Sequence, residues 1–163
     1  MIRPAQKSDA PDIAWLWNRM IRDTLATFTT IEKTVSDVEA IVKARQGSFW
    51  VYEAAERIAG FATFGPFRAG PGYAATCEHS VIVAPHAARS GIGSALMEAL
   101  CTAARGQGLH VMVAAISSAN PAAVAFHANL GFVEVGRMPQ VGRKSGQFLD
   151  LILMQKMLGP VGS

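Results

Sequence analysis

The sequence predicts a single α/β domain in which helices flank a mixed, mainly antiparallel central sheet. Segments with apolar residues at helical spacing are interspersed with segments that alternate or run apolar as strands do. Some neighbouring strands are joined by tight turns and others by helices, so the sheet is expected to be mixed. The chain has 163 residues, half of them hydrophobic, which is enough for one substantial core.

The first half of the chain carries the signals of one strand, two helices and a β-hairpin. Ser8 is a suitable helix N-cap before apolar residues at intervals of three and four, and Gly47 ends a second helical pattern. Strong strand formers such as Trp50 and Phe61 then flank a polar turn. The expected elements are a strand at 2–5, a helix that begins at 8 and includes 21, a less periodic segment at 24–33, a helix at 34–46, and strands at 49–52 and 58–64.

The second half alternates strands with helices. A loop rich in glycine and proline at 65–72 leads into a long central strand. Asn120 and Pro121 open a helix, because the missing N–H of proline is harmless at the first helical position, and Gly131 closes it. The expected strands lie at 73–84, 111–116, 132–141 and 148–157, a helix lies at 91–105, and the domain at 1–158 precedes a flexible tail at 159–163.

The turn after the central strand is the most informative motif. Pro85 ends the strand because it has no N–H, and Gly91 and Gly93 allow a sharp turn with inward backbone amides. Apolar residues at helical spacing follow from Ile92, so these amides lie at a helix N-terminus, which attracts phosphate. An ordinary tight turn is the alternative. A Walker loop is excluded because no Gly-Lys-Ser/Thr follows the turn. A complete dinucleotide fingerprint is excluded because the third glycine at the required spacing is missing.

Composition and charge narrow the class of protein. Fifteen basic and twelve acidic residues give a net charge of +3, without a basic run that would bind nucleic acid or a membrane surface. A small polyanionic ligand suits this balance. Neither a signal-like N-terminus nor a membrane-length apolar segment is visible, so we expect a cytoplasmic protein. Cys77 and Cys101 are expected to be free thiols, without a disulfide or metal site.

With this element order and the pattern Asn120-x-x-Ala123-x-x-x-His127, the chain resembles the GNAT superfamily of acetyl-CoA-dependent N-acetyltransferases over nearly its whole length. The resemblance implies the GNAT-like sheet and acetyl-CoA as cosubstrate, with no metal. Three motifs look like the branch that acetylates phosphinothricin and methionine sulfoximine or sulfone. They are Thr-Cys-Glu-His-Ser-Val-Ile-Val at 76–83, Phe-His-Ala-Asn-Leu-Gly-Phe at 126–132 and Gly-Arg-Lys-Ser-Gly-Gln-Phe-Leu-Asp at 142–150.

The sequence departs from these patterns at three positions. Ala88 stands where the superfamily usually has Gln or Arg, but the neighbouring Arg89 can serve the pyrophosphate, and backbone amides make most phosphate contacts in such a turn. Ala74 and Phe148 replace a basic residue and a tryptophan that are common in the branch. Cofactor identity is therefore better constrained than substrate identity. The cofactor-binding residues implied by the resemblance are Val81, Ile82, Val83, Arg89, Ser90, Gly91, Ile92, Gly93, Ser94 and Asn120.

Two residues are candidates for moving protons. Glu78 lies on the central strand, where desolvation raises the pKa of a carboxylate, and it matches the branch's proposed base; a strand-end glutamate paired with a surface arginine is the alternative. His127 occupies a position where many superfamily members have a tyrosine that protonates the thiolate. An imidazole can donate or relay that proton, and a packed histidine is the alternative. His79 points to the face opposite Glu78 and is interpreted as structural.

Several residues are expected to bind the acyl acceptor. Arg68 and Tyr73 flank a glycine-rich loop, where an arginine can bind a carboxylate or phosphinate, although it can equally be a solvated surface cation. Lys144, with Arg143, is a second candidate anion clamp, which can act across the dimer interface that the branch is expected to form. Phe28 resembles a residue that lines the acceptor pocket, and a core residue is the alternative.

Direct transfer within a ternary complex is expected, because neither cysteine has the basic partner that marks a covalent acetyl carrier. Backbone amides near Val83 can stabilise the acetyl oxygen if the central strand separates from the strand at 111–116. Asn120 caps its helix and, by the resemblance, contacts the pantetheine arm; Ser94 faces the phosphate site or is a solvated first-turn serine. The alternatives to an amino-acid acceptor are an aminoglycoside, a peptide N-terminus, or a silent acetyl-CoA-binding module.

Overall fold

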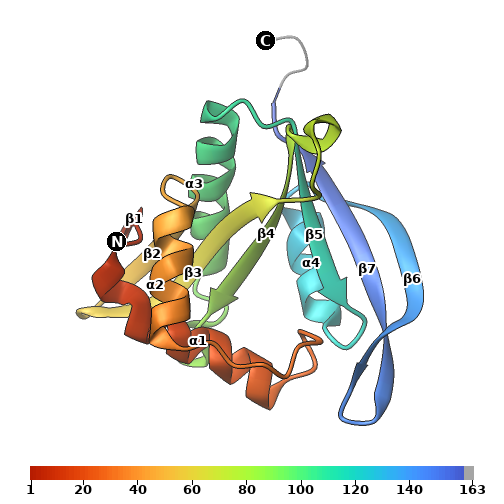
Figure 1. Cartoon of the computed structure of the whole chain (residues 1–163), viewed down its shortest axis with the longest axis horizontal. Coiled ribbons are helices and arrows are strands. Elements are labelled where there is room, and N and C mark those ends of the chain that lie inside the picture. Colours follow the sequence, from red (N-terminus) through yellow and green to blue (C-terminus); the bar gives the residue numbers. More distant parts are fainter. Residues whose placement is uncertain (160–163) are drawn as a thin grey trace.

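The fold is a single sheet covered by helices on both faces (Figure 1), seen in a computed structural model that describes residues 1–159. The elements are β1 (Ile2–Pro4), α1 (Ala10–Asp23), α2 (Val35–Ala44), β2 (Phe49–Ala54), β3 (Arg57–Pro66), β4 (Thr76–Val83), α3 (Ile92–Gly106), β5 (Val111–Ser117), α4 (Pro121–Asn129), β6 (Val133–Lys144) and β7 (Gln147–Met157). The expected tail falls mostly at 160–163, outside the described residues.

The seven strands lie in the order β1-β2-β3-β4-β5-β7-β6. Every neighbouring pair is antiparallel except β4 and β5, which run parallel because α3 connects them. The predicted mixed, mainly antiparallel sheet is therefore confirmed. The single parallel pair stands in the middle of the sheet, where a loss of pairing opens the interior rather than an edge.

Two hydrophobic cores fix the helices to the two faces. On one face, Leu96 and Leu100 of α3 pack with strand residues such as Met112 and Ile152, and α4 adds partly buried residues to this cluster. On the other face, α1 and α2 cover β2 and β3. Figure 1 shows α1 and α2 in front of the sheet and α3 and α4 behind it. Side chains alternate along β4, so successive residues of this strand face different helix pairs.

The N-terminal boundaries differ from the prediction. Ser8 is not the helix N-cap: Lys7–Asp9 form a 3-10 turn, and α1 begins at Ala10. The reason is Asp9, whose carboxylate binds the Gln6 N–H at 2.7 Å and the Arg3 guanidinium at 2.8 Å and so closes a tighter turn first. The second helix is as predicted at its start, where the Thr34 hydroxyl accepts the Asp37 N–H at 3.0 Å.

Two strand boundaries differ as well. The central strand begins at Thr76 rather than at residue 73, because Pro71–Tyr73 form a 3-10 turn. The expected connection at 142–147 is mostly strand: β6 continues to Lys144, and only Ser145 and Gly146, with φ of 52° and 74°, make the turn. Positive φ at both central residues is the backbone that matches the twist of a hairpin.

Beyond Glu78, the central strands β4 and β5 separate. β4 pairs with β3 from Cys77 to Val83, but it pairs with β5 only from Thr76 to Glu78, opposite Val111–Val113. The separation that the backbone stabilisation of the acetyl oxygen requires is therefore present. It leaves a gap in the sheet that side chains of β4, β5 and α4 line.

Candidate active site

A groove of about 670 Å³ lies between the turn after β4 and helix α4. Arg89 and Gly91 have φ of 61° and 84°, a backbone that directs the chain around the start of α3. Gly93 has another role, because a Cβ there would meet the Phe126 ring at 3.2 Å. The two glycines thus give the groove its turn and its width, and the N-terminus of α3 lies along it.

Most predicted cofactor residues line this groove. They are Val81, Val83, Arg89, Gly91, Gly93, Ser94 and Asn120. Three others do not present their side chains there. Ile82 faces the α1 side of the sheet, Ile92 packs in the core, and the Ser90 hydroxyl donates to the Ala87 carbonyl within the turn. Any contact from Ser90 or Ile92 to a phosphate would therefore use the backbone.

A smaller cavity of about 110 Å³ occupies the gap between β4 and β5. Its walls come from β4, from Ala114–Ile116 of β5, from α4, and from Met20 and Ala26 on the α1 side. Val81, Asn120, Ala123 and His127 line both this cavity and the groove. The two spaces therefore share a wall at the middle of the sheet.

Asn120 connects the helix to both spaces. Its side-chain oxygen accepts the Ala123 N–H at 3.3 Å, so it caps α4 as predicted. Because the cap fixes the amide, Asn120 keeps one orientation toward the groove.

Glu78 is the last residue of β4 that pairs with β5. Burial raises the pKa of its carboxyl group above the ordinary value, and the positive charge of Arg45 opposes this rise. None of the ion pairs within residues 1–159 includes Glu78, so the surface-pair alternative is not what the structure shows. Glu78 is exposed to solvent and lines neither the groove nor the central cavity, so the raised pKa, rather than enclosure, is what suits its carboxylate to accept a proton.

His79 and His127 contact each other behind β4. Their Nε2 atoms are 2.9 Å apart, and both side chains are buried. His79 faces away from Glu78, as predicted, but this face is where His127 lies. Burial lowers the pKa of His127 and lowers that of His79 to about 3, the neighbouring imidazole adding to the latter effect. Both rings line the central cavity, and the sequence interpretation missed the contact between them.

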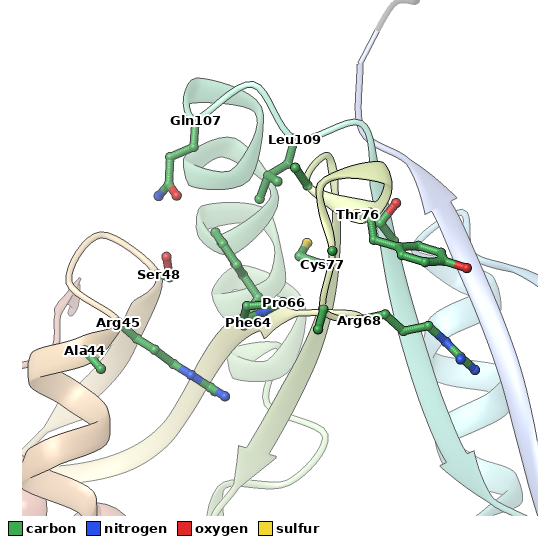
Figure 2. A pocket seen from close by; sticks show the side chains of 15 residues that line it. Ala44, Arg45, Ser48, Phe64, Pro66, Arg68, Thr76, Cys77, Gln107 and Leu109 are labelled. Carbon is green, nitrogen blue, oxygen red and sulfur yellow. The ribbon is translucent and has the colours of Figure 1, made fainter.

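A pocket of about 460 Å³ lies near the start of β4, beside the loop that joins β3 to β4 (Figure 2). Arg45 enters from the end of α2, and Arg68 lies on the other side. Tyr73 also lines the pocket and packs its ring against Phe67 at 5.8 Å. The structure thus brings Arg68 and Tyr73 together, as predicted, and adds Arg45, which the sequence interpretation missed.

Arg45 is a half-buried cation over a glycine. A Cβ on Gly65 would come within 2.8 Å of the Arg45 Nη2, and Gly65 pairs with Glu78 across the sheet. Nη1 donates to the Thr63 hydroxyl at 3.3 Å. Burial lowers the pKa of Arg45, and the charge of Glu78 opposes this. The guanidinium therefore lies close enough to Glu78 to influence its proton affinity.

The prediction that Lys144 binds a substrate anion is wrong. Its side chain is buried, and its ammonium donates to the carbonyls of Ile21, Thr24 and Thr27 at 2.6, 2.8 and 2.9 Å. An ammonium has three N–H donors, so none is left for a substrate anion. Lys144 instead holds the end of α1 against the sheet.

Phe28 lies in the segment between α1 and α2 and is half-buried. Gly142 of β6 faces its ring so closely that a Cβ there would come within 2.6 Å. The aromatic ring therefore helps to fix this segment on the β6–β7 hairpin, beside the central cavity rather than in its wall.

The two cysteines are not suited to nucleophilic catalysis. Cys77 and Cys101 are buried free thiols, and burial raises the pKa of Cys77 to about 12, which disfavours a nucleophilic thiolate. Among residues 1–159, His, Cys, Asp and Glu side chains form no group that could hold a metal. No helix in the same range is long and apolar enough to cross a membrane.

Known proteins resemble this chain in sequence and in structure. The pattern of the Acetyltransferase (GNAT) family matches residues 14–132. An L-methionine sulfoximine/L-methionine sulfone acetyltransferase from Pseudomonas paraeruginosa is 40% identical, with 99% of this chain and 96% of that protein covered. A phosphinothricin N-acetyltransferase from Streptomyces coelicolor is 34% identical, with 96% and 95% covered. The structure of yncA, a putative acetyltransferase from Salmonella typhimurium with its cofactor acetyl-CoA, is 37% identical with a TM-score of 0.95, and the match covers 100% of this chain and 96% of that chain.

Proposed function

Since this chain belongs to the GNAT family and is an acetyl-CoA-dependent N-acetyltransferase, we propose that it acetylates the α-amino group of a small amino-acid analogue. Phosphinothricin, methionine sulfoximine and methionine sulfone are the proposed acceptors. The relatives named for these substrates support the proposal because they match nearly the whole chain. Transfer is direct, without an acetylated enzyme.

The observation that carries the proposal is the central gap in the sheet. The groove reaches it from the α3 and α4 side, and the gap begins beyond Glu78, the last paired residue of β4, whose side chain faces the opposite side of the sheet from His79. Acetyl-CoA in the groove and an amine on the α1 and α2 side would therefore meet between β4 and β5. Such an arrangement brings the nitrogen and the acetyl carbon together without a covalent carrier.

Glu78 is the proposed base. An amine attacks only when it has lost its ammonium proton, and a carboxylate with a raised pKa accepts this proton more readily than an ordinary one. The nitrogen then bonds to the acetyl carbon as the carbon–sulfur bond breaks. The nitrogen loses its second proton, and the thiolate gains one through His127, which lines both spaces.

The cations of the pocket in Figure 2 favour an acidic acceptor. Arg45 and Arg68 line it, and a guanidinium binds carboxylate or phosphinate oxygens in pairs. An aminoglycoside is polycationic and would require acidic walls. No aspartate or glutamate is among the residues that line this pocket within the described chain, 1–159.

Glu78→Gln tests the proposed base. We expect acetyl transfer to fall by about 10² or more while acetyl-CoA affinity stays within about twofold, because Glu78 lies outside the groove. Glu56→Gln, in the exposed turn between β2 and β3, is the matched control. Unchanged turnover in Glu78→Gln would remove Glu78 from the mechanism. Acetyl-CoA binding without turnover in the unmodified protein would favour the silent module.

A homodimer in the cytoplasm is also proposed. The β6–β7 hairpin exposes several large apolar side chains, and contiguous exposed apolar surface is typical of an interaction site. They are Val133, Val135, Met138, Val141 and Phe148, exposed by 47 to 64%. Light scattering should give twice the mass of one chain, whereas a monomer at micromolar concentration would contradict the proposal.

A further inference from the structure

Three contacts link two buried histidines to each other and to the backbone. His79 Nδ1 lies 3.2 Å from the Val113 carbonyl oxygen, the two Nε2 atoms lie 2.9 Å apart, and His127 Nδ1 lies 2.7 Å from the Ala123 carbonyl oxygen. Val113 is the last residue of β5 that pairs with β4. The imidazole of His79 therefore spans the place where the two strands separate, and His127 reaches it from α4.

The number of protons on these rings is constrained by the contacts. A hydrogen bond needs one hydrogen between its two heavy atoms, and carbonyl oxygens carry none. The three contacts therefore need three protons on the four ring nitrogens. Two neutral imidazoles carry only two, so one contact must set two lone pairs against each other.

Burial sets the opposite preference. Desolvation disfavours an imidazolium, so the pair is neutral at rest, with one proton fewer than its contacts require. A third proton costs the pair desolvation but completes all three hydrogen bonds. Within residues 1–159, no charged side chain contributes to the pKa shift of either ring apart from the neighbouring imidazole; Glu78 faces the other side of β4, and Phe126 and Phe132 pack against the rings beside the cavity.

We propose that His79 and His127 act as one proton relay. His127 is the catalytic residue, and His79 is the positioning residue, whose ring nitrogens allow the pair to hold a third proton in a complete set of hydrogen bonds. The inference rests on the proposed acetyl transfer. The acceptor ammonium gives its first proton to Glu78, which releases it to solvent. As the carbon–nitrogen bond forms and the carbon–sulfur bond breaks, the second nitrogen proton passes to the pair, and the pair returns a proton to the CoA thiolate. The pair ends neutral, as it began.

His79→Asn tests the relay. Its amide nitrogen can still donate to the Val113 carbonyl, but the shorter side chain cannot reach His127. We expect kcat to fall about tenfold or more, with KM and the acetyl-CoA Kd within about twofold, and the pH profile of kcat to lose one ionisation. His86→Asn, at an exposed histidine outside both cavities, is the matched control and should keep the kcat and pH profile of the unmodified protein.

A double variant separates a relay from two independent residues. If the histidines act as a unit, His79→Asn combined with His127→Asn should lose no more kcat than His127→Asn alone, within about twofold. Additive losses would overturn the inference. So would a folded His79→Asn protein with the kcat and pH profile of the unmodified enzyme.

Nitrogen NMR of the histidine rings gives a test that needs no turnover. In the unmodified protein, both rings should gain protonated-nitrogen signals over one pH interval, and His79→Asn should shift the titration of His127. Identical His127 titration in the two proteins would overturn the inference. If no amine is acetylated but the rings titrate together, the proposed function fails and the coupled pair stands; if transfer occurs and the rings titrate independently, only the relay fails.

Discussion

The replacement of Lys144 by methionine distinguishes a structural cation from a substrate clamp. The Lys144 ammonium donates to three carbonyls at the end of α1 and in the segment that follows it. Methionine keeps much of the length and the apolar stem but has no N–H donor. The variant therefore removes three hydrogen bonds from a buried position while disturbing the packing little.

The expected loss of stability follows from these contacts. A hydrogen bond to a charged group contributes about 1.5–3 kcal/mol, but the variant also removes the cost of burying an ammonium, which is several kcal/mol. We expect a net loss of about 3 kcal/mol in the free energy of unfolding. For a chain of this length, each kcal/mol lowers Tm by about 2–4 °C, so Tm should fall by about 6–12 °C.

Urea unfolding followed by circular dichroism measures this loss. Arg143→Met is the matched control, because Arg143 is exposed and its guanidinium lies over the Phe148 ring at 5.2 Å. Its effect should stay within about 0.5 kcal/mol. A Lys144→Met protein as stable as the unmodified one would show that the three ammonium hydrogen bonds do not stabilise the fold. If its KM for an anionic acceptor rose as well, the prediction that Lys144 binds a substrate anion would be supported again.

Two further variants test the walls of the site. Gly93→Ala should weaken acetyl-CoA binding about threefold to tenfold in a calorimetric titration, because the new Cβ forces the Phe126 ring to move at 3.2 Å, and unchanged affinity would contradict the packing argument. Arg45→Gln removes the charge that lowers the pKa of Glu78, so the carboxylate becomes protonated at higher pH. The acid limb of the kcat/KM profile should then move to higher pH, and a shift to lower pH would contradict it.

The sequence could predict those parts of the fold that depend on local signals. Helical spacing around Leu96, the Asn120–Pro121 start of α4 and the glycines of the turn all correspond to observed structure. The prediction of Ser8 as the helix N-cap was wrong because Asp9 binds Arg3, a contact that no local sequence pattern indicates. The prediction of Lys144 as an anion clamp was wrong for a similar reason, since its carbonyl partners lie more than a hundred residues earlier in the chain.

The candidate site was predicted in the same uneven way. Residues within the turn and on one helix face share a short sequence span, so their placement followed from spacing. Arg45 offered no such signal, because only the pairing of β3 with β4 brings Gly65 beneath it and Glu78 beside it. His79 did offer one: it shares the strand face of Val81, which lines the groove, and period-two alternation alone could have placed it there.

The proposed acetyl transfer to a small amino-acid analogue can be measured as the release of CoA thiol from acetyl-CoA with a panel of amines. The panel contains L-phosphinothricin, L-methionine sulfoximine, L-methionine sulfone, ordinary amino acids, an aminoglycoside and short peptides. We expect turnover with the sulfur and phosphorus analogues and little with the others. Turnover confined to the aminoglycoside or the peptides, or acetyl-CoA binding without turnover on any amine, would contradict it.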